Sequence, residues 1–197
     1  MKFILKKLDL EKSLGNLSKA SQLKSDALVI TSYQLADTKK KKLSDLVASF
    51  DETLGGVITD LVNDENFKFK AGETASLRLS GSDRAAFALG PIKKVILVGL
   101  GEEKDFDKKT ERKVAASILR KAKAEKLTSF AVDNFGDIGL LVETLGLVSY
   151  EFTKYKSSDQ NDDKNELSEI TILSNSVTAK EKAALAKSEI IIDSVNK

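Results

Sequence analysis

The chain has 197 residues, and its 32 Lys and Arg nearly balance its 30 Asp and Glu, for a formal net charge of +2. It contains neither Cys nor His, which excludes disulfides, thiolate nucleophiles, Ser-His-Asp triads and His-ligated metals. The N-terminal apolar run meets Lys6 and Lys7 too early for a secretory signal, and no later run approaches the roughly 18 residues of a membrane span. We therefore expect one main domain in a soluble, cytoplasmic protein.

Short apolar runs predict the strands of a sheet. Two of them, 27–30 and 95–98, are continuously apolar, as expected of strands that helices cover on both faces. In a third run, 74–79, apolar and polar residues alternate, which predicts a more exposed strand. The full set of predicted strands is 2–8, 27–30, 74–79, 95–98, 130–132 and 170–173.

Apolar residues at helical spacing separate these strands. Asp37 and Asp107 are the predicted N-caps of two helices, and Gly55-Gly56 marks a bend or a close packing contact. The predicted helical stripes fall within 43–50, 54–62, 114–122, 138–152 and 179–195. Strands that alternate with helices predict an α/β fold, a three-layer α/β/α sandwich around a mixed, mostly parallel sheet.

The last predicted helix, Ala179 to Val195, carries a broad apolar face that no later element can bury. Either this face docks back on the domain, or the chain continues into another domain, and the abrupt end at Lys197 favours the second expectation. The residues of this face are Ala184, Leu185, Ile191, Ile192 and Val195.

The segment 99–104 follows a strand and precedes a helix, where a phosphate-binding loop would lie. Lys104 stands where a dinucleotide fingerprint requires a third glycine, and the Gly-Lys-Ser/Thr of a P-loop is missing. Because Glu102 and Glu103 would also repel a phosphate, we favour a tight turn at the strand end.

Two groups of acidic residues invite a metal-site interpretation, since carboxylates bind Mg²⁺ and Ca²⁺. In the first group, capping of the following helix and its macrodipole explain the acids better. The second group lacks the spacing of an EF-hand, which predicts a solvated loop. The groups are Glu102, Glu103, Asp105 and Asp107, and Asp159, Asp162 and Asp163.

Basic residues form a run at Lys39 to Lys42 and mix with aromatic residues from Tyr150 to Lys156. Such mixtures occur on nucleic-acid-binding surfaces. The near-neutral net charge argues against that function here. We favour a solvated helix face and core aromatic residues.

Five segments in order give the chain a resemblance to a known family. They are 26–29 (DALV), 54–56 (LGG), 69–74 (FKAGET), 94–101 (KVILVGLG) and 150–156 (YEFTKYK). In these segments the chain resembles the N-terminal domain of the leucine aminopeptidase (cytosol aminopeptidase) family of metal-dependent exopeptidases. The resemblance spans roughly residues 25–173.

This resemblance implies a macro-domain-like domain over 1–175 and a linker helix over 176–197 that leads to a C-terminal peptidase domain. In the family that C-terminal domain holds two divalent metals, Mn or Zn, and all catalytic residues. Its motif Asn-Thr-Asp-Ala-Glu-Gly-Arg-Leu does not occur here, so we expect no catalytic, cofactor-binding or metal residue in this chain. The complete protein is then expected to be a hexamer that removes N-terminal residues such as leucine from peptides.

Two alternatives remain open. The first is a free-standing macro-like module that binds ADP-ribose or another nucleotide, although segment 30–34 (ITSYQ) replaces the Asn-rich segment of macrodomains. The second is a DNA-binding domain, whose affinity would depend on salt.

Overall fold

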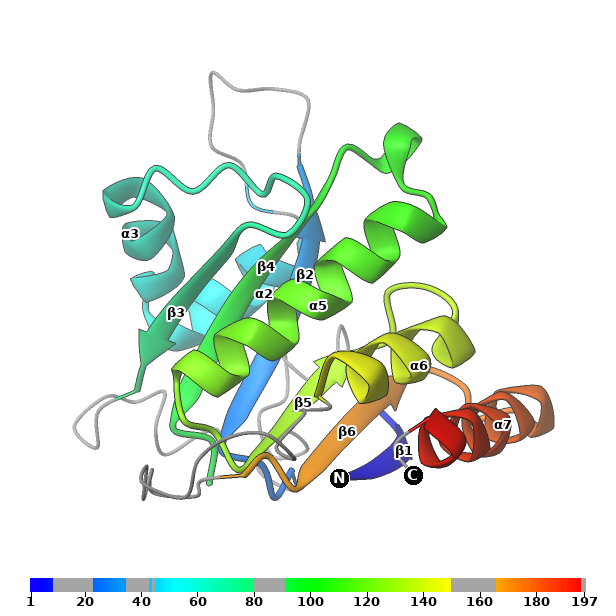
Figure 1. Ribbon diagram of the computed structural model, residues 1–197. Helices are drawn as coiled ribbons and strands as arrows, with labels where there is room; N and C mark the ends of the chain where they lie inside the picture. Colours follow the sequence, from blue (N-terminus) through cyan, green and yellow to red (C-terminus); the bar gives the residue numbers. More distant parts are fainter. Residues whose placement is uncertain (9–22, 35–42, 44, 80–90, 150–165, 196–197) are drawn as a thin grey trace, which may run out of the picture.

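The computed structural model (Figure 1) describes residues 1–8, 23–34, 43, 45–79, 91–149 and 166–195. Its strands form one sheet in the order β1-β6-β5-β2-β4-β3. Neighbouring strands are parallel except β3 and β4, which are antiparallel. The mixed, mostly parallel sheet is therefore confirmed. The strands are β1 (Lys2–Lys7), β2 (Ala27–Tyr33), β3 (Thr74–Arg78), β4 (Lys94–Gly101), β5 (Ser129–Asp133) and β6 (Glu169–Ser174).

The continuously apolar strands lie at the centre of this sheet. β2 pairs with both β4 and β5, and its residues from Ala27 to Ser32 are all buried. The alternating strand β3 lies at one edge, which explains its greater exposure. The position of a strand in the sheet therefore follows from whether one or both of its faces are apolar.

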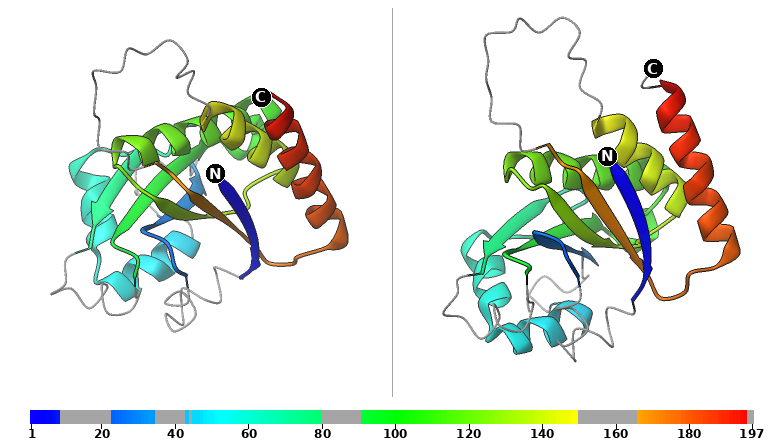
Figure 2. Two further views of the ribbon diagram at one scale, coloured as in Figure 1. Left: turned by 60° about the horizontal axis from the view of Figure 1, so that its bottom comes forward. Right: turned by 90° about the horizontal axis from the view of Figure 1, so that it is seen from below.

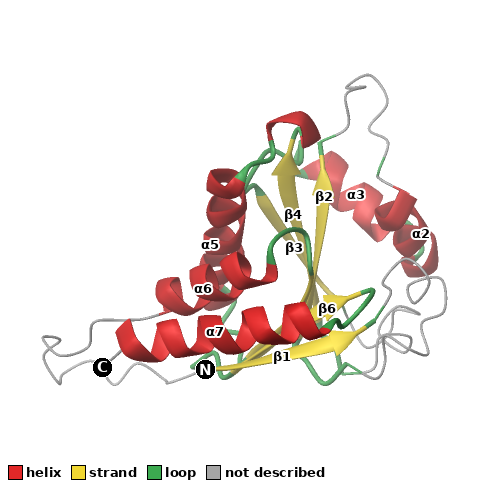
Figure 3. Ribbon diagram, turned by 90° about the vertical axis from the view of Figure 1, so that its right-hand side faces the viewer, coloured by secondary structure: helices red, strands yellow, loops and turns green. Residues whose placement is uncertain are grey.

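Helices cover both faces of the sheet, as Figure 3 shows. One face carries α2 (Asp45–Leu54) and α3 (Val57–Asp64). The other carries α5 (Lys108–Ala124), α6 (Ile138–Ser149) and α7 (Ala179–Val195). The predicted three-layer α/β/α sandwich is confirmed, and it contains one hydrophobic cluster on each side of the sheet.

The Gly55-Gly56 pair is a bend between α2 and α3. Both glycines have positive φ angles, 79° and 90°, and a Cβ on either would meet nothing within 4 Å. The pair is therefore required by the turn and makes no close packing contact. Asp51 completes the turn, since its carboxylate accepts the backbone N–H of Ile58 at 2.7 Å and also bonds Thr59.

The last helix, α7, runs beside α6 and contacts β1 at the edge of the sheet (Figure 2). The buried Ser188 hydroxyl donates to the Gly139 carbonyl at 3.1 Å, and Ile192 packs against Gly146. Part of the apolar face thus docks on the domain, while Val195 of that face stays exposed, as does Ile190 outside it. Among the described residues, no helix combines the length and the apolar character needed to cross a membrane.

Candidate functional site

The glycines at the end of β4 form hydrogen bonds with the backbone of the loop 69–73. The Gly99 N–H donates to the Glu73 carbonyl at 2.9 Å, and the Gly101 N–H donates to the Phe69 carbonyl at 3.0 Å. In return, the Gly72 N–H donates to the Gly99 carbonyl at 2.9 Å. The N–H groups of Gly99 and Gly101 are therefore used by the loop 69–73 and are not available to bind a phosphate.

The loop 69–73 crosses over the end of β4 and is held by its own residues. The Glu73 carboxylate accepts the backbone N–H groups of Lys68 and Lys70, at 3.0 and 2.9 Å. Phe69 adopts a positive φ of 57°, which is rare for a bulky residue, and its buried ring packs edge-on against Phe67 at 4.7 Å. The motif FKAGET thus builds a strand-capping loop.

The acids at 102–107 shape the start of α5. Asp107 is its N-cap, as the sequence predicts, and accepts the Thr110 N–H at 2.7 Å, a hydrogen bond that lowers the pKa of its carboxyl. Glu102 pairs with Lys104 at 2.8 Å in solvent. Within the part of the chain that the structure describes, no group of three or more potential ligands is placed to hold a metal ion.

Several residues that the sequence singles out lie outside the described ranges. The interpretations of these residues as a helix N-cap, a solvated loop, a solvated helix face or core aromatics remain predictions. They are Asp37, Lys39 to Lys42, Tyr150, Lys154, Tyr155, Lys156, Asp159, Asp162 and Asp163.

Sequence reasoning missed two acids. One lies at the carboxyl end of a strand of the sheet, and the other lies in the first turn of α5. The first is Asp133, at the end of β5, whose carboxylate accepts the backbone N–H of Thr31 at 3.2 Å and its hydroxyl at 2.6 Å. Asp133 is half-buried. Burial raises the pKa of Asp133 to about 6, against the opposing effect of the Thr31 hydrogen bonds.

The second missed acid is Glu111, which is buried in the first turn of α5. Its carboxylate accepts the Asp137 N–H at 2.7 Å, and Asp137 in turn accepts the Leu140 N–H in the first turn of α6 at 3.1 Å. Burial raises the pKa of Glu111, and the nearby charge of Asp137 adds to the effect. A lone acid on an otherwise apolar helical stripe was the available sequence signal.

Three partly exposed aromatic rings, Tyr33 at the end of β2 and two phenylalanines, pack against one another, and Tyr33 interacts electrostatically with Glu111. Tyr33 packs edge-on against Phe106 at 5.6 Å, and Phe106 packs against Phe135 at 6.4 Å. Ligands of open α/β sheets bind at this carboxyl edge where the strand order reverses, here between β2 and β5. Asp133 already accepts two hydrogen bonds from Thr31, so its carboxylate links β5 to β2. Binding of ADP-ribose at this edge remains a prediction.

Comparisons with known proteins agree with this architecture. The sequence model described as "Cytosol aminopeptidase family, N-terminal domain" matches residues 29–159. A probable cytosol aminopeptidase of Alkaliphilus oremlandii is 35% identical over 151 residues, which are 71% of this chain and 28% of the relative. One from Microcystis aeruginosa is 35% identical over 76% of this chain and 29% of the relative. The chain thus spans under a third of the length of these relatives.

Solved structures show the same fold. A mutant of tomato leucine aminopeptidase superposes with a TM-score of 0.73 at 18% identity, over 99% of this chain and 36% of that one. The bottromycin maturation enzyme BotP superposes with a TM-score of 0.54 at 17% identity, over 86% of this chain and 30% of that one. Together with the match over 29–159, these findings show that the chain belongs to the cytosol aminopeptidase family and corresponds to its N-terminal domain.

Proposed function

We propose that this chain is the accessory and assembly domain of a leucine aminopeptidase, and that it is inactive by itself. The observation that carries the proposal is the match of residues 29–159 to the N-terminal domain of the family. The relatives that share this domain are named probable cytosol aminopeptidases and are more than three times as long as the matched segment. Peptide hydrolysis would then belong to the rest of the polypeptide.

The structural roles of the motif residues support the assignment of peptide hydrolysis to the rest of the polypeptide. The glycines of β4 and the loop 69–73 satisfy each other's backbone groups. Asp107 and Asp137 cap helices, and Asp133 and Glu111 accept hydrogen bonds within the domain. These side chains hold the sandwich together, and we assign none of them a catalytic step.

The two divalent metals, Mn or Zn, would reside in the catalytic domain. Two-metal hydrolases need several carboxylate or imidazole ligands that converge on a pair of ions. The described residues of this chain supply no such cluster, and the sequence has no His. The donors among the described residues therefore do not fit a metal pair, and the residues of this chain would act by positioning the catalytic domain.

Helix α7 would provide the link between the two domains. Its Ser188 and Ile192 fasten it to α6, so it would project toward the catalytic domain as part of a rigid body. We place the whole protein in the cytoplasm as a hexamer, with peptides bound by the catalytic domain.

The test is hydrolysis of leucine amide by purified residues 1–197 with Mn²⁺ or Zn²⁺ present. The proposal predicts no turnover above the metal-only blank, while a full-length family member assayed in parallel is active. Metal-dependent turnover that co-purifies with the chain through two different columns would show that the domain carries its own active site, and the proposal would be wrong.

A further inference from the structure

Helix α7 is apolar on two sides, and only one of them is covered. Ser188 and Ile192 are buried against α6. Ile190 lies two residues from each of them, on the opposite side of the helix, and is 70% exposed, more than any other large apolar residue that the structure describes. A helix that is apolar all round is normally buried. The outer side of α7, on which Figure 2 and Figure 3 show no other described element, is therefore a candidate contact surface.

The outer side of α7 carries a narrow row of apolar residues that ends in Ile190. Its members follow one another at spacings of four, three and four residues, which place them on one side of a helix, and all are exposed. Alanines leave room for a second helix to approach closely, and Ile190 supplies a large apolar side chain. We call these residues the α7 row. They are Ala179, Ala183, Ala186 and Ile190.

The charges beside the α7 row stand in an order that a single helix disfavours. Lys180 and Lys182 lie in its first turn, whereas Glu189 and Asp193 lie in its last two turns, which contain no base. The helix macrodipole favours acids near the N-terminus and bases near the C-terminus. Within the described ranges, none of these four side chains forms an ion pair. A second α7 that runs antiparallel would set acids beside the bases and bases beside the acids.

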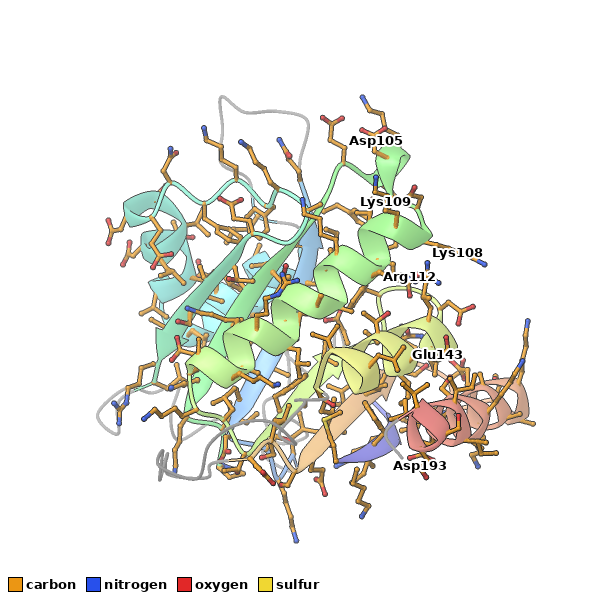
Figure 4. All side chains as sticks on the ribbon, in the orientation of Figure 1. Asp105, Lys108, Lys109, Arg112, Glu143 and Asp193 are labelled. Carbon is orange, nitrogen blue, oxygen red and sulfur yellow. The ribbon has the colours of Figure 1, made fainter. Side chains whose placement is uncertain are left out.

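The positions of these charges fit such an antiparallel pair. Lys182, Glu189 and Asp193 follow at spacings of seven and four residues, so they share one flank of the α7 row. In Figure 4 the labelled Asp193 lies in the C-terminal half of α7, on the outside of the molecule. A two-fold axis near Ala186 would bring Lys182 opposite Glu189 and Asp193 of the partner subunit, and the symmetry would repeat the contact. A parallel pair would instead place Lys182 opposite Lys182 of the partner subunit.

From these observations we infer that the outer side of α7 binds the same surface of a second copy of this chain, antiparallel, around a two-fold axis. The inference is independent of the proposed peptidase role, because it rests on α7 alone. The α7 row is narrow, so the contact would bury less than the roughly 1,200 Å² of a stable interface. The other flank would also bring Lys187 near Lys187 of the partner subunit. We therefore expect a weak dimer whose affinity falls as salt is added.

Sedimentation equilibrium of residues 1–197 from about 10 to about 500 μM tests the inference. Lys182→Glu and Asp193→Lys each place like charges opposite each other, and each should weaken dimerisation about tenfold. Both substitutions follow the preference of the macrodipole, so a loss of affinity would not reflect a weaker helix. The double variant Lys182→Glu/Asp193→Lys exchanges the two charges and should dimerise at least about threefold more tightly than either single variant.

The matched control is Lys109→Glu, which makes the same charge change at an exposed position of α5. It should alter the affinity by less than about twofold, whereas Lys187→Gln should strengthen the dimer by about twofold or more.

Three results would overturn the inference. The first is a single-chain mass at every concentration, which would indicate that another domain of the polypeptide covers this side of α7. The second is a double variant whose loss is the sum of the two single losses, because the two charges would then not meet across the axis. The third is an equal loss in the Lys109→Glu control, which would reflect net charge alone.

Discussion

Gly99 of β4 and Phe69 of the crossing loop meet backbone against backbone. A Cβ built on Gly99 would collide with the carbonyl group of Phe69 and with the carbonyl oxygen of Lys70. The two segments are 30 residues apart in the chain, and each belongs to a different motif of the family resemblance. The motifs FKAGET and KVILVGLG therefore form one structural unit.

Gly99→Ala is expected to destabilise the domain by about 3 kcal/mol, because the added methyl group meets backbone that has little freedom to move. Gly55→Ala is the control, since Gly55 has a positive φ but open space around it. It is expected to lose about 1–2 kcal/mol from backbone strain alone. Urea unfolding measures both, and a Gly99→Ala protein as stable as Gly55→Ala would contradict the packing argument.

Asp133→Asn is expected to stabilise the protein at pH 7.5 by about 1–3 kcal/mol, from 1.36 kcal/mol per pKa unit. Burial raises the folded-state pKa of Asp133 from 3.8 to about 6. Its carboxyl therefore favours folding below about pH 4, and this stabilisation is lost as the pH rises through 6. The Asn amide can donate to the Thr31 hydroxyl, so the link between β5 and β2 is kept.

Urea unfolding at pH 4, 5, 6 and 7.5 measures the difference in unfolding free energy between Asp133→Asn and the parent protein, which should shrink toward pH 4. Asp107→Asn serves as a control of opposite sign, because the pKa of Asp107 is lowered by its bond to Thr110. That variant should be less stable than the parent at pH 7.5, and the difference should fade as the pH drops through the lowered pKa. An Asp133→Asn protein that is less stable than the parent by the same amount at every pH would refute the account.

Glu111→Ala is expected to destabilise the domain by about 1–3 kcal/mol, since the Asp137 N–H would lose its acceptor. Glu111→Gln keeps an acceptor oxygen and removes the repulsion from Asp137, so its loss should stay below about 1 kcal/mol. Denaturant unfolding at neutral pH compares the two. Equal losses would show that the charge of Glu111, and not its hydrogen bond, holds α6 in place.

Gly146→Ala should loosen α7, because the new methyl group would overlap the Ile192 side chain. We expect a loss of about 1–3 kcal/mol and faster amide exchange in α7. In an Ile192→Ala background the methyl group has room, and the same change should be neutral or stabilising by up to about 1 kcal/mol, as Gly to Ala is within helices. Additive effects of the two substitutions would mean that these residues do not contact each other.

Sequence alone predicts the strands and helix ends that short residue patterns determine. The continuous apolar run at 95–98 predicts a buried central strand, and Asp107 before a helical stripe predicts an N-cap. Contacts between distant segments were not predictable in this way. The closeness of Gly99 to Phe69 and the bond from Thr31 to Asp133 depend on tertiary placement, so neither motif nor spacing reveals them.

The distribution of charge between the two helical layers is also not predictable from the sequence alone. A sum over the chain gives +2 and hides the fact that α2 and α3 carry only acids while α5 exposes only bases. The layer to which each helix belongs is set by strand order, which a linear count of charges does not contain. Lone buried acids such as Glu111 do not cluster with other acids in the sequence, and their burial depends on tertiary packing.

Reading the gene past the codon for Lys197 tests the central claim most directly. The account predicts that the frame continues into a domain that carries the family's metal-binding motif, Asn-Thr-Asp-Ala-Glu-Gly-Arg-Leu or a close variant. A stop codon directly after Lys197 would contradict it, because an accessory domain of an aminopeptidase would then have no catalytic domain to serve.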